Sequence, residues 1–161
     1  MGGWAFQCSY KGKSVVKYGW SPCSSNNAME LTAIFRALQY IPEGEQTVNI
    51  LTDSTYCKNV ITKWAIGWEL YGWTTATGLP VRNKEIIAPM MALIEKHSNN
   101  RIVNVQWIKG HSGIDNNEIV DGAAGNARKQ RLTNWVQQHN KHQSERILHR
   151  KRLEDGHSSR D

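Results

Sequence analysis

The stretch TVNILTDSTY, residues 47–56, decides the fold of this chain. Residues 47–51 are typical of a strand with inward-facing apolar side chains, and residues 54–64 predict the helix that follows. Asp53 stands between the two, at the carboxyl end of the strand. Open α/β sheets bind their ligands at that end of their strands. The stretch therefore predicts a strand-to-helix unit with an acidic side chain at the functional edge of the sheet.

The flanking segments extend this unit in both directions. On the N-terminal side, residues 4–10 and 14–20 predict a β-hairpin around Lys11-Gly12-Lys13, and residues 27–41 predict a helix. On the C-terminal side we expect a Trp- and Gly-rich excursion over 64–80, a helix over 82–97 bent near Pro89, a strand over 101–108, a loop over 109–116, and helices over 117–129 and from 132 to about 150. The pattern predicts a mixed α/β fold with helices flanking the sheet.

Length and composition predict one globular domain. The chain has 161 residues, of which 39% are hydrophobic, and it contains no apolar run of about 18 residues that would span a membrane. The N-terminus lacks the pattern of a secretory signal. Cys8, Cys23 and Cys57 are widely spaced, which argues against a disulfide framework and a zinc site. We therefore expect a reducing, cytoplasmic setting.

The positive charge is concentrated at one end of the chain. The net charge is +6, and residues 128–161 carry nine Lys/Arg and four Asp/Glu, which is +5 of that total. We expect a domain over residues 1–130 and a basic C-terminal helix or tail over 131–161. Such a tail is either a solvated segment or a non-specific contact for nucleic acid.

Three carboxylates occur in distinctive contexts. Glu30 follows Asn26 and Asn27, Asp53 ends the strand described above, and Asp121 follows a Lys-Gly-His-Ser-Gly loop. Each has an ordinary alternative, because Asn27 and Glu30 have the spacing of a capping box, Asp53 precedes a helix, and Asp121 would suit a solvated helix face. If the three converge at the edge of the sheet, their mutual repulsion calls for a cation, and hard oxygen ligands favour Mg²⁺ or Mn²⁺ over zinc.

Four motifs occur in order along the chain and together resemble one known family. They are Asn26-Asn27-x-Met29-Glu30-Leu31, Thr52-Asp53-Ser54-x-Tyr56, Trp64-x3-Trp68-x4-Trp73 with Pro80-Val81-x-Asn83, and Trp107-x-Lys109-Gly110-His111-x-Gly113 with Asn117-Glu118-x2-Asp121. The set closely resembles the ribonuclease H family, of the bacterial type with a Trp-containing basic protrusion. The resemblance covers about residues 2–130.

The resemblance implies an endonuclease that hydrolyses the RNA strand of an RNA–DNA hybrid. It implies that Glu30, Asp53 and Asp121 bind two Mg²⁺ ions, with Mn²⁺ as an alternative, and that the products carry 5′-phosphate and 3′-hydroxyl ends. His111 matches a loop residue that assists proton transfer or product release. The implied partner is the hybrid, contacted by a monomer. The implied substrate contacts are Ser25, Asn26, Asn27, Trp68, Trp73 and Lys109.

The sequence departs from the family pattern in its protrusion. The stretch 68–72 lacks the basic cluster expected there, and Thr55 replaces a longer amide side chain. The spacing of Trp64 and Trp68 puts both on one helix face, where Trp64 is better explained by a small satellite core than by substrate contact. A weaker contact with the hybrid from this element is expected, with the basic tail compensating.

The first strand of the family has no counterpart here. In the family, that strand is central in the sheet and bears a further catalytic Asp. The first residues of this sequence, Met1-Gly2-Gly3-Trp4-Ala5, match the end of the turn that follows the strand. Three explanations remain open. The chain is a fragment or starts at a wrong codon; it is a genuinely truncated, inactive relative, one form of which has the hairpin closing onto the 47–52 strand; or the tail around residues 153–158 replaces the strand.

The functional alternatives follow from the missing Asp. One is a ribonuclease H-type enzyme, whose activity in this chain is impaired by the loss. Another is a catalytically inactive relative that holds hybrid or other nucleic acid without cutting it. A resolvase- or integrase-like nuclease is a third reading, against which the Trp protrusion and the Lys109–Gly113 loop count.

Overall fold

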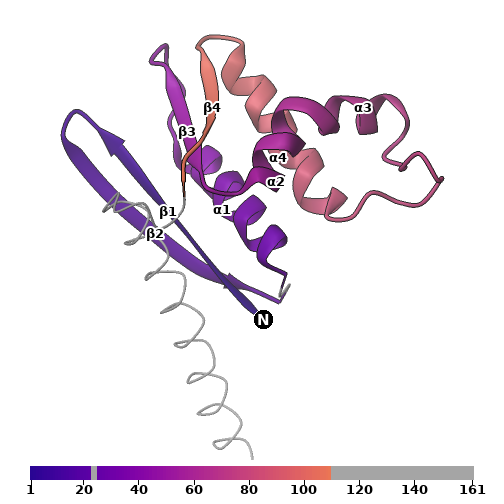
Figure 1. Cartoon of the computed structure of the whole chain (residues 1–161). Helices are drawn as coiled ribbons and strands as arrows, with labels where there is room; N and C mark the ends of the chain where they lie inside the picture. The colour runs from indigo at the N-terminus through magenta and orange to yellow at the C-terminus, as the bar shows by residue number, and fades with distance from the viewer. Residues whose placement is uncertain (23–24, 110–161) are drawn as a thin grey trace, which may run out of the picture.

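The structure is a computed structural model that describes residues 1–22 and 25–109. The elements, in chain order, are β1 (Gly2–Tyr10), β2 (Lys13–Ser21), α1 (Asn26–Tyr40), β3 (Val48–Thr52), α2 (Thr55–Asn59), a π-helical turn (Val60–Trp64), α3 (Ala65–Leu70), α4 (Lys84–Ser98) and β4 (Val103–Trp107). This is the mixed α/β arrangement that the sequence predicted (Figure 1). The predicted loop over 109–116, except Lys109, and the helices beyond it lie outside the described residues.

The predicted hairpin is confirmed, and a two-residue turn closes it. β1 and β2 are antiparallel from Gly2↔Ser21 to Tyr10↔Lys13. Lys11 and Gly12 both have positive φ, 48° and 75°, as a type I′ turn requires. This turn twists in the same sense as the strands, so the hairpin needs no bulge next to it.

The strands form two separate pairs in the described part of the chain. β3 and β4 are parallel, in register from Val48↔Val103 to Thr52↔Trp107, while β1 pairs with β2. The hairpin therefore does not close onto β3, the arrangement considered above for one form of a truncated, inactive relative. Figure 1 shows the two pairs on either side of a gap, with α1 running beside it.

The helical region after β3 is longer than predicted. The sequence predicted a helix over 54–64 and then an irregular excursion, but the helical backbone continues through the π-helical turn and α3 to Leu70. Packing explains the difference, because Ile61 and Ala65 are buried and hold this segment on the core. α4 confirms the predicted helix over 82–97 with shifted bounds, and Pro89 lies inside it.

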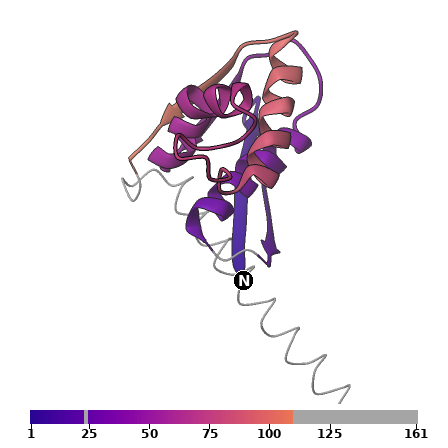
Figure 2. The same ribbon diagram turned by 90° about the vertical axis from the view of Figure 1, so that its right-hand side faces the viewer.

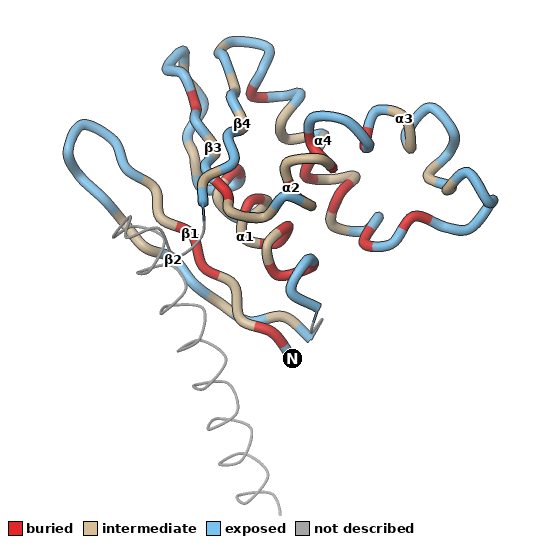
Figure 3. Tube along the Cα trace, in the orientation of Figure 1, coloured by how far each residue is buried: buried red, intermediate tan, exposed pale blue. Residues whose placement is uncertain are grey.

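The core lies between α1, α4 and the α2–α3 segment. Its fully buried large side chains are Leu31, Leu38, Val60, Cys57, Ile87 and Met90. Figure 3 shows these helices buried where they face each other, whereas the tip of the hairpin and the loop after α3 are exposed. Figure 1 places α1 between the hairpin and the other helices, and the turned view shows these elements overlapping along that direction (Figure 2). α1 therefore carries the hairpin on one side and the core on the other.

One buried contact ties the far end of α1 to α4. The His97 imidazole Nε2 lies 2.9 Å from the Leu38 carbonyl oxygen, which belongs to the last turn of α1. The carbonyls of a last helical turn lack intrahelical partners, so this buried contact satisfies one of them. Within the described residues, no helix has the length and hydrophobicity needed to cross a membrane.

Candidate active site

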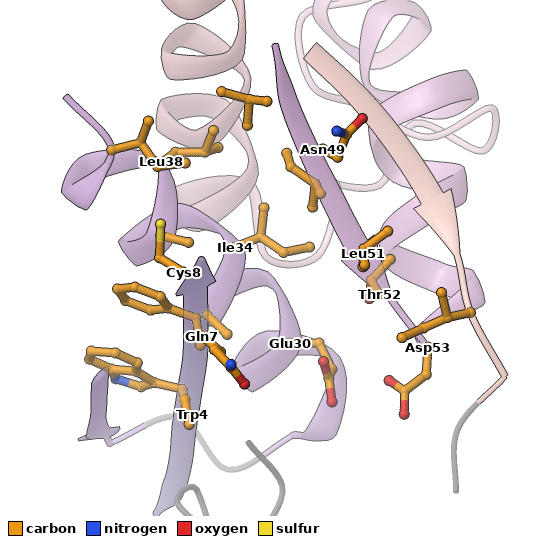
Figure 4. A pocket seen from close by; sticks show the side chains of 18 of the residues that line it. Trp4, Gln7, Cys8, Glu30, Ile34, Leu38, Asn49, Leu51, Thr52 and Asp53 are labelled. Carbon is orange, nitrogen blue, oxygen red and sulfur yellow. The ribbon is translucent and has the colours of Figure 1, made fainter. Parts of the chain in front are cut away.

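A groove separates the hairpin from β3. It has a volume of about 420 Å³ and is lined by residues 3–9 of β1, by α1 and by residues 48–53. Figure 4 shows that β1 and β3 form its two sides and α1 its floor, and that Glu30 and Asp53 lie at one end. The groove therefore opens at the same edge of the sheet at which the sequence placed the acidic side chains.

Glu30 reaches this end of the groove from α1. The N-cap of α1 is Ser25, whose Oγ accepts a hydrogen bond from the Ala28 backbone N–H at 3.2 Å. The capping-box alternative for Asn27 and Glu30 is therefore wrong, because the N-cap lies two residues earlier. Glu30 is half-buried and lines the groove.

Asp53 reaches the groove end from the β3–α2 junction. Its alternative as a plain N-cap is also wrong, because Ser54 caps α2 and its Oγ accepts from the Cys57 N–H at 3.1 Å. The junction is fixed by two further bonds: Thr52 Oγ1 accepts from the Ser54 N–H, and the Trp107 indole Nε1 donates to the Asp53 carbonyl at 2.9 Å. The backbone of Asp53 is thus held by β4, and its carboxylate points toward the groove (Figure 4).

Both carboxylates act on the same buried thiol. Burial raises the pKa of Cys57 to about 12, the hydrogen bond with Ser54 opposes this rise, and the charges of Glu30 and Asp53 add to it. The charges of both acids therefore reach the same thiol. Within the described residues, no group of three or more His, Cys, Asp and Glu side chains is placed to hold a metal ion.

The third predicted acid cannot be placed. Asp121 and His111 both lie outside the described residues, so their convergence with Glu30 and Asp53 stays a prediction. Lys109 is described and exposed, directly after Ile108, whose N–H donates to the Thr52 carbonyl at 2.9 Å. Lys109, the last described residue, therefore follows β4 at the same sheet edge as Asp53.

The remaining predicted contact residues divide into two groups. Ser25, Asn26 and Asn27 are exposed at the first turn of α1, on the same helix as Glu30. Trp68 and Trp73, in contrast, pack as half-buried side chains against the core at the far side of α2. The Trp64 ring contacts Tyr56 and Trp68 at centroid distances of 6.1 and 5.8 Å, as the satellite-core interpretation predicted.

Two residues of the site were not singled out by the sequence analysis. Trp107 occurred in a motif without a role, and the structure shows that it holds the Asp53 backbone. Cys57 was considered only as a thiol without disulfide or zinc partners, yet it is fully buried and the charges of both carboxylates raise its pKa. Its spacing of three residues after the Ser54 cap was the only available signal, because such a position faces inward on the first helical turn.

Comparison with known proteins places the chain in a family. The RNase H family profile matches residues 1–129. The chain belongs to the ribonuclease H family. It is 38% identical over 124 residues to ribonuclease H of Hyphomonas neptunium, covering 76% of this chain and 79% of that protein. It is 44% identical over 106 residues to ribonuclease H of Mycolicibacterium smegmatis, covering 66% of this chain and 64% of that protein.

Solved structures share the ribonuclease H fold with this chain. LC9-RNase H1, described as a type 1 RNase H with the type 2 active-site motif, matches with a TM-score of 0.54 at 21% identity, over 78% of this chain and 72% of that one. A foamy viral protease-reverse transcriptase in complex with an RNA/DNA hybrid matches with a TM-score of 0.56 at 12% identity, over 78% of this chain and 19% of that one. At these identities the likeness concerns the fold alone.

Proposed function

We propose that this ribonuclease H family chain is an endonuclease that hydrolyses the RNA strand of RNA–DNA hybrids with the help of divalent metal ions. The observation that carries the proposal is the placement of Glu30 and Asp53. They come from different elements, α1 and the β3–α2 junction, and lie at the same end of one groove. Neither is used as a helix cap, since serines fill both capping positions.

The donor set fits a hard divalent cation. Two carboxylates near one point repel each other, and a cation between them removes that cost. Oxygen ligands of this kind suit Mg²⁺ or Mn²⁺, and we propose two Mg²⁺ ions held by Glu30, Asp53 and Asp121. Bound there, the ions would activate water and stabilise the leaving 3′-oxygen, giving 5′-phosphate products. His111 would accept or donate a proton at the ring nitrogen that faces the reacting oxygen.

The hybrid is the substrate that the surroundings of the site suit best. Asn26 and Asn27 expose amide groups beside Glu30, and such groups can read a minor groove in which the RNA 2′-hydroxyls are displayed. Lys109 would contact a phosphate next to Asp53. The family and the hybrid bound by the reverse transcriptase relative support the same substrate. We propose further that the chain acts as a monomer in the cytoplasm.

Trp68 and Trp73 are retained as hybrid contacts only through the exposed part of their rings. Both are half-buried against the core, so the exposed part of each side chain would pack on DNA sugars. Trp73 adopts a positive φ of 64°, and its N–H donates to the Trp68 carbonyl. The backbone of the two residues is therefore held together before any substrate binds.

Cleavage of a labelled hybrid tests the proposal. An RNA strand with a 5′ fluorophore, annealed to DNA, is incubated with the 161-residue chain and Mg²⁺, and the products are sized. Asp53→Asn and Glu30→Gln should each lower the rate by about 10²-fold or more, the order seen when one charge-stabilising group leaves an active site. Glu43→Gln is the matched control, because Glu43 is an exposed acid paired with Lys96 on the surface. Equal rates for all four proteins would refute the assignment.

Binding without cleavage is the second candidate. It is favoured by the observation that only two acids lie at the groove end in the described part of the chain. In that case the parent chain leaves the hybrid intact at every Mg²⁺ concentration, yet retains it on a filter. Retention should fall as salt is raised from 50 to 200 mM, as phosphate contacts require. Cleavage by the parent chain that Asp53→Asn abolishes would exclude this candidate.

A further inference from the structure

The hairpin and α1 carry positive charge that the fold does not neutralise. Residues 1–42 contain a single acid, Glu30, and its side chain lines the groove. The same residues contain four basic side chains, all of them exposed: Lys11, Lys13, Lys17 and Arg36. Within the described part of the chain, none of these four cations forms an ion pair with an acid. Their charge is therefore available to an anionic ligand.

Aromatic rings, rather than acids, lie against these cations. The contacts, at 5.3, 5.6 and 5.9 Å from the ring centres, are Lys11 over Tyr10, Lys17 over Tyr40, and Arg36 over Trp4. A ring attracts a cation through the negative face of its quadrupole, but it carries no charge that would neutralise the cation. Each contact therefore orders a basic side chain and leaves its positive charge in place.

The cations and rings of the hairpin share one of its two faces. The Phe6 ring packs on Tyr40, so the face that bears Phe6 is the one turned toward α1. Tyr10 lies on that face as well, because side chains four residues apart on a strand point the same way. Lys17 is directly opposite Phe6, and Lys13 is directly opposite Tyr10. Residues directly opposite each other in a ladder lie on the same face, so both lysines belong to this surface.

Gly19 directs this surface to the side of the hairpin away from the groove. It is opposite Trp4, and a Cβ at Gly19 would overlap the Trp4 ring, which therefore lies across β2. Figure 4 shows the Trp4 side chain directed away from Asp53. From Gly19 to Lys13, β2 spans about 20 Å. We call this surface the cationic strip; its members are Trp4, Tyr10, Lys11, Lys13, Lys17, Arg36 and Tyr40.

The alternation of cations and rings matches the chemistry of an unpaired nucleic-acid strand. Surfaces that bind single strands combine cations that follow the phosphates with aromatic rings on which bases stack. A duplex keeps its bases inside its own stack, and an acidic peptide has no bases, so neither uses the rings in this way. Lysines also guard exposed strand edges against pairing with other chains. That role does not account for Arg36, which lies on a helix, or for the rings.

We propose that the cationic strip binds single-stranded nucleic acid without sequence preference. The phosphates of the strand would contact the four cations. Its bases would stack on the accessible parts of the Tyr10 and Tyr40 rings, which are 54% and 46% exposed. This binding goes beyond the proposed cleavage of hybrids, because the strip lies on the β2 side of the hairpin and the groove with Glu30 and Asp53 lies between β1 and β3.

The salt dependence of oligonucleotide binding tests the phosphate contacts. A fluorescent oligo-dT of about ten nucleotides is titrated with the 161-residue chain in metal-free buffer, and its anisotropy gives Kd between 50 and 200 mM salt. Each phosphate contact of a single strand adds about 0.7 to the slope of log K against log salt. Lys13→Gln should therefore lower the slope by about 0.7, and Lys11→Gln with Lys13→Gln by about 1.4. Lys96→Gln is the matched control, because Lys96 is an exposed lysine paired with Glu43, and it should leave the slope unchanged.

A tyrosine pair on opposite faces of the hairpin tests base stacking. Tyr10→Ala should weaken oligo-dT binding by about fivefold or more, because it removes a ring on which a base stacks. Tyr10→Phe keeps the ring and should retain the affinity. Tyr18→Ala is the matched control, because Tyr18 is 53% exposed but lies opposite Ala5, on the other face of the hairpin. The ring contact between Phe6 and Tyr40, followed by NMR, reports whether the hairpin stays on α1 in each variant.

Three outcomes would overturn the proposal. An unchanged salt slope in Lys11→Gln with Lys13→Gln would show that the oligonucleotide binds elsewhere on the chain. Equal weakening by Tyr10→Ala and Tyr18→Ala would show that the ring on the strip has no special part in binding. Displacement of the oligonucleotide by an equal concentration of a poly-glutamate peptide of the same charge would identify a general anion surface instead. None of these measurements involves hybrid, metal or cleavage, so the proposal and the nuclease assignment can fail separately.

Discussion

Phe6→Ala should release the β1–β2 hairpin while leaving the helical core folded. Among the described elements, the hairpin packs mainly on α1, and its main anchor is Phe6, which is only 8% exposed. The Phe6 ring lies 5.7 Å from that of Tyr40, and the Lys17 ammonium lies over the same Tyr40 ring. Removing the Phe6 ring therefore removes the contact around which the hairpin–helix interface is organised.

The free-energy cost of Phe6→Ala decides whether the hairpin alone or the whole domain unfolds. Replacing a buried Phe by Ala costs about 3–5 kcal/mol, from lost transfer free energy and the cavity that remains. An isolated two-stranded hairpin is marginally stable at best in water. A loss of that size therefore exceeds what holds the hairpin on α1. The core cluster around Leu38, Ile87 and Met90 contains no side chain of the hairpin, so its packing is retained.

Hydrogen exchange followed by NMR separates the two regions. In Phe6→Ala, the Val15 amide, which belongs to the hydrogen-bonded pair Cys8↔Val15 of the hairpin, should exchange at a rate near that of an unfolded chain, whereas the Met90 amide of α4 should keep its protection. Tyr18→Ala is the matched control, because Tyr18 is an aromatic side chain of the same hairpin but is 53% exposed. Equal loss of protection at Val15 and Met90 would refute the reasoning, since it would show that hairpin and core unfold as one unit.

Further predictions concern the Ser54 cap of α2 and the buried Cys57 thiol. Ser54→Ala removes the cap of α2 and should lower the free energy of unfolding by about 1 kcal/mol in urea titration, whereas Ser54→Asp should restore most of it; equal stability of the two variants would contradict the cap's role. The Cys57 thiol has a pKa of about 12 in the folded chain against an ordinary 9.0, so it should resist thiol reagents at pH 8 while half-buried Cys8 reacts. Because the folded-state pKa is raised, the stabilising contribution of the neutral thiol is complete below pH 9 and is lost as pH rises from 9 toward 12. Stability of a Cys57→Ala variant should therefore fall less over that range than that of the parent.

The fold was predictable where local chemistry dictates it. Lys11-Gly12 between alternating residues is a strong hairpin signal, and the structure has the corresponding turn with both φ values positive. The continuation of the helix to Leu70 was not predictable in the same way. Gly67 and the neighbouring Trp residues indicate irregular backbone, but burial of Ala65 and packing of Trp68 on the core outweigh the cost of a helical glycine.

The site was predictable in its acids but not in their support. Glu30 and Asp53 were expected at one sheet edge, and both lie there. The indole of Trp107 and the thiol of Cys57 depend on which segments become neighbours, since Trp107 is 54 residues from Asp53 in the chain. No periodicity in the sequence encodes that contact. It arises because β3 and β4 pair in parallel, which carries the end of β4 to the end of β3.

Serine side chains, and not the two carboxylates, cap the helices next to the groove. A carboxylate in the first turn of a helix is stabilised by the helix dipole and often serves as its cap. Here Ser25 and Ser54 bond the free amides of α1 and α2, so capping does not consume the charges of Glu30 and Asp53. Both acids line the groove, where a bound cation would relieve the repulsion between their two charges.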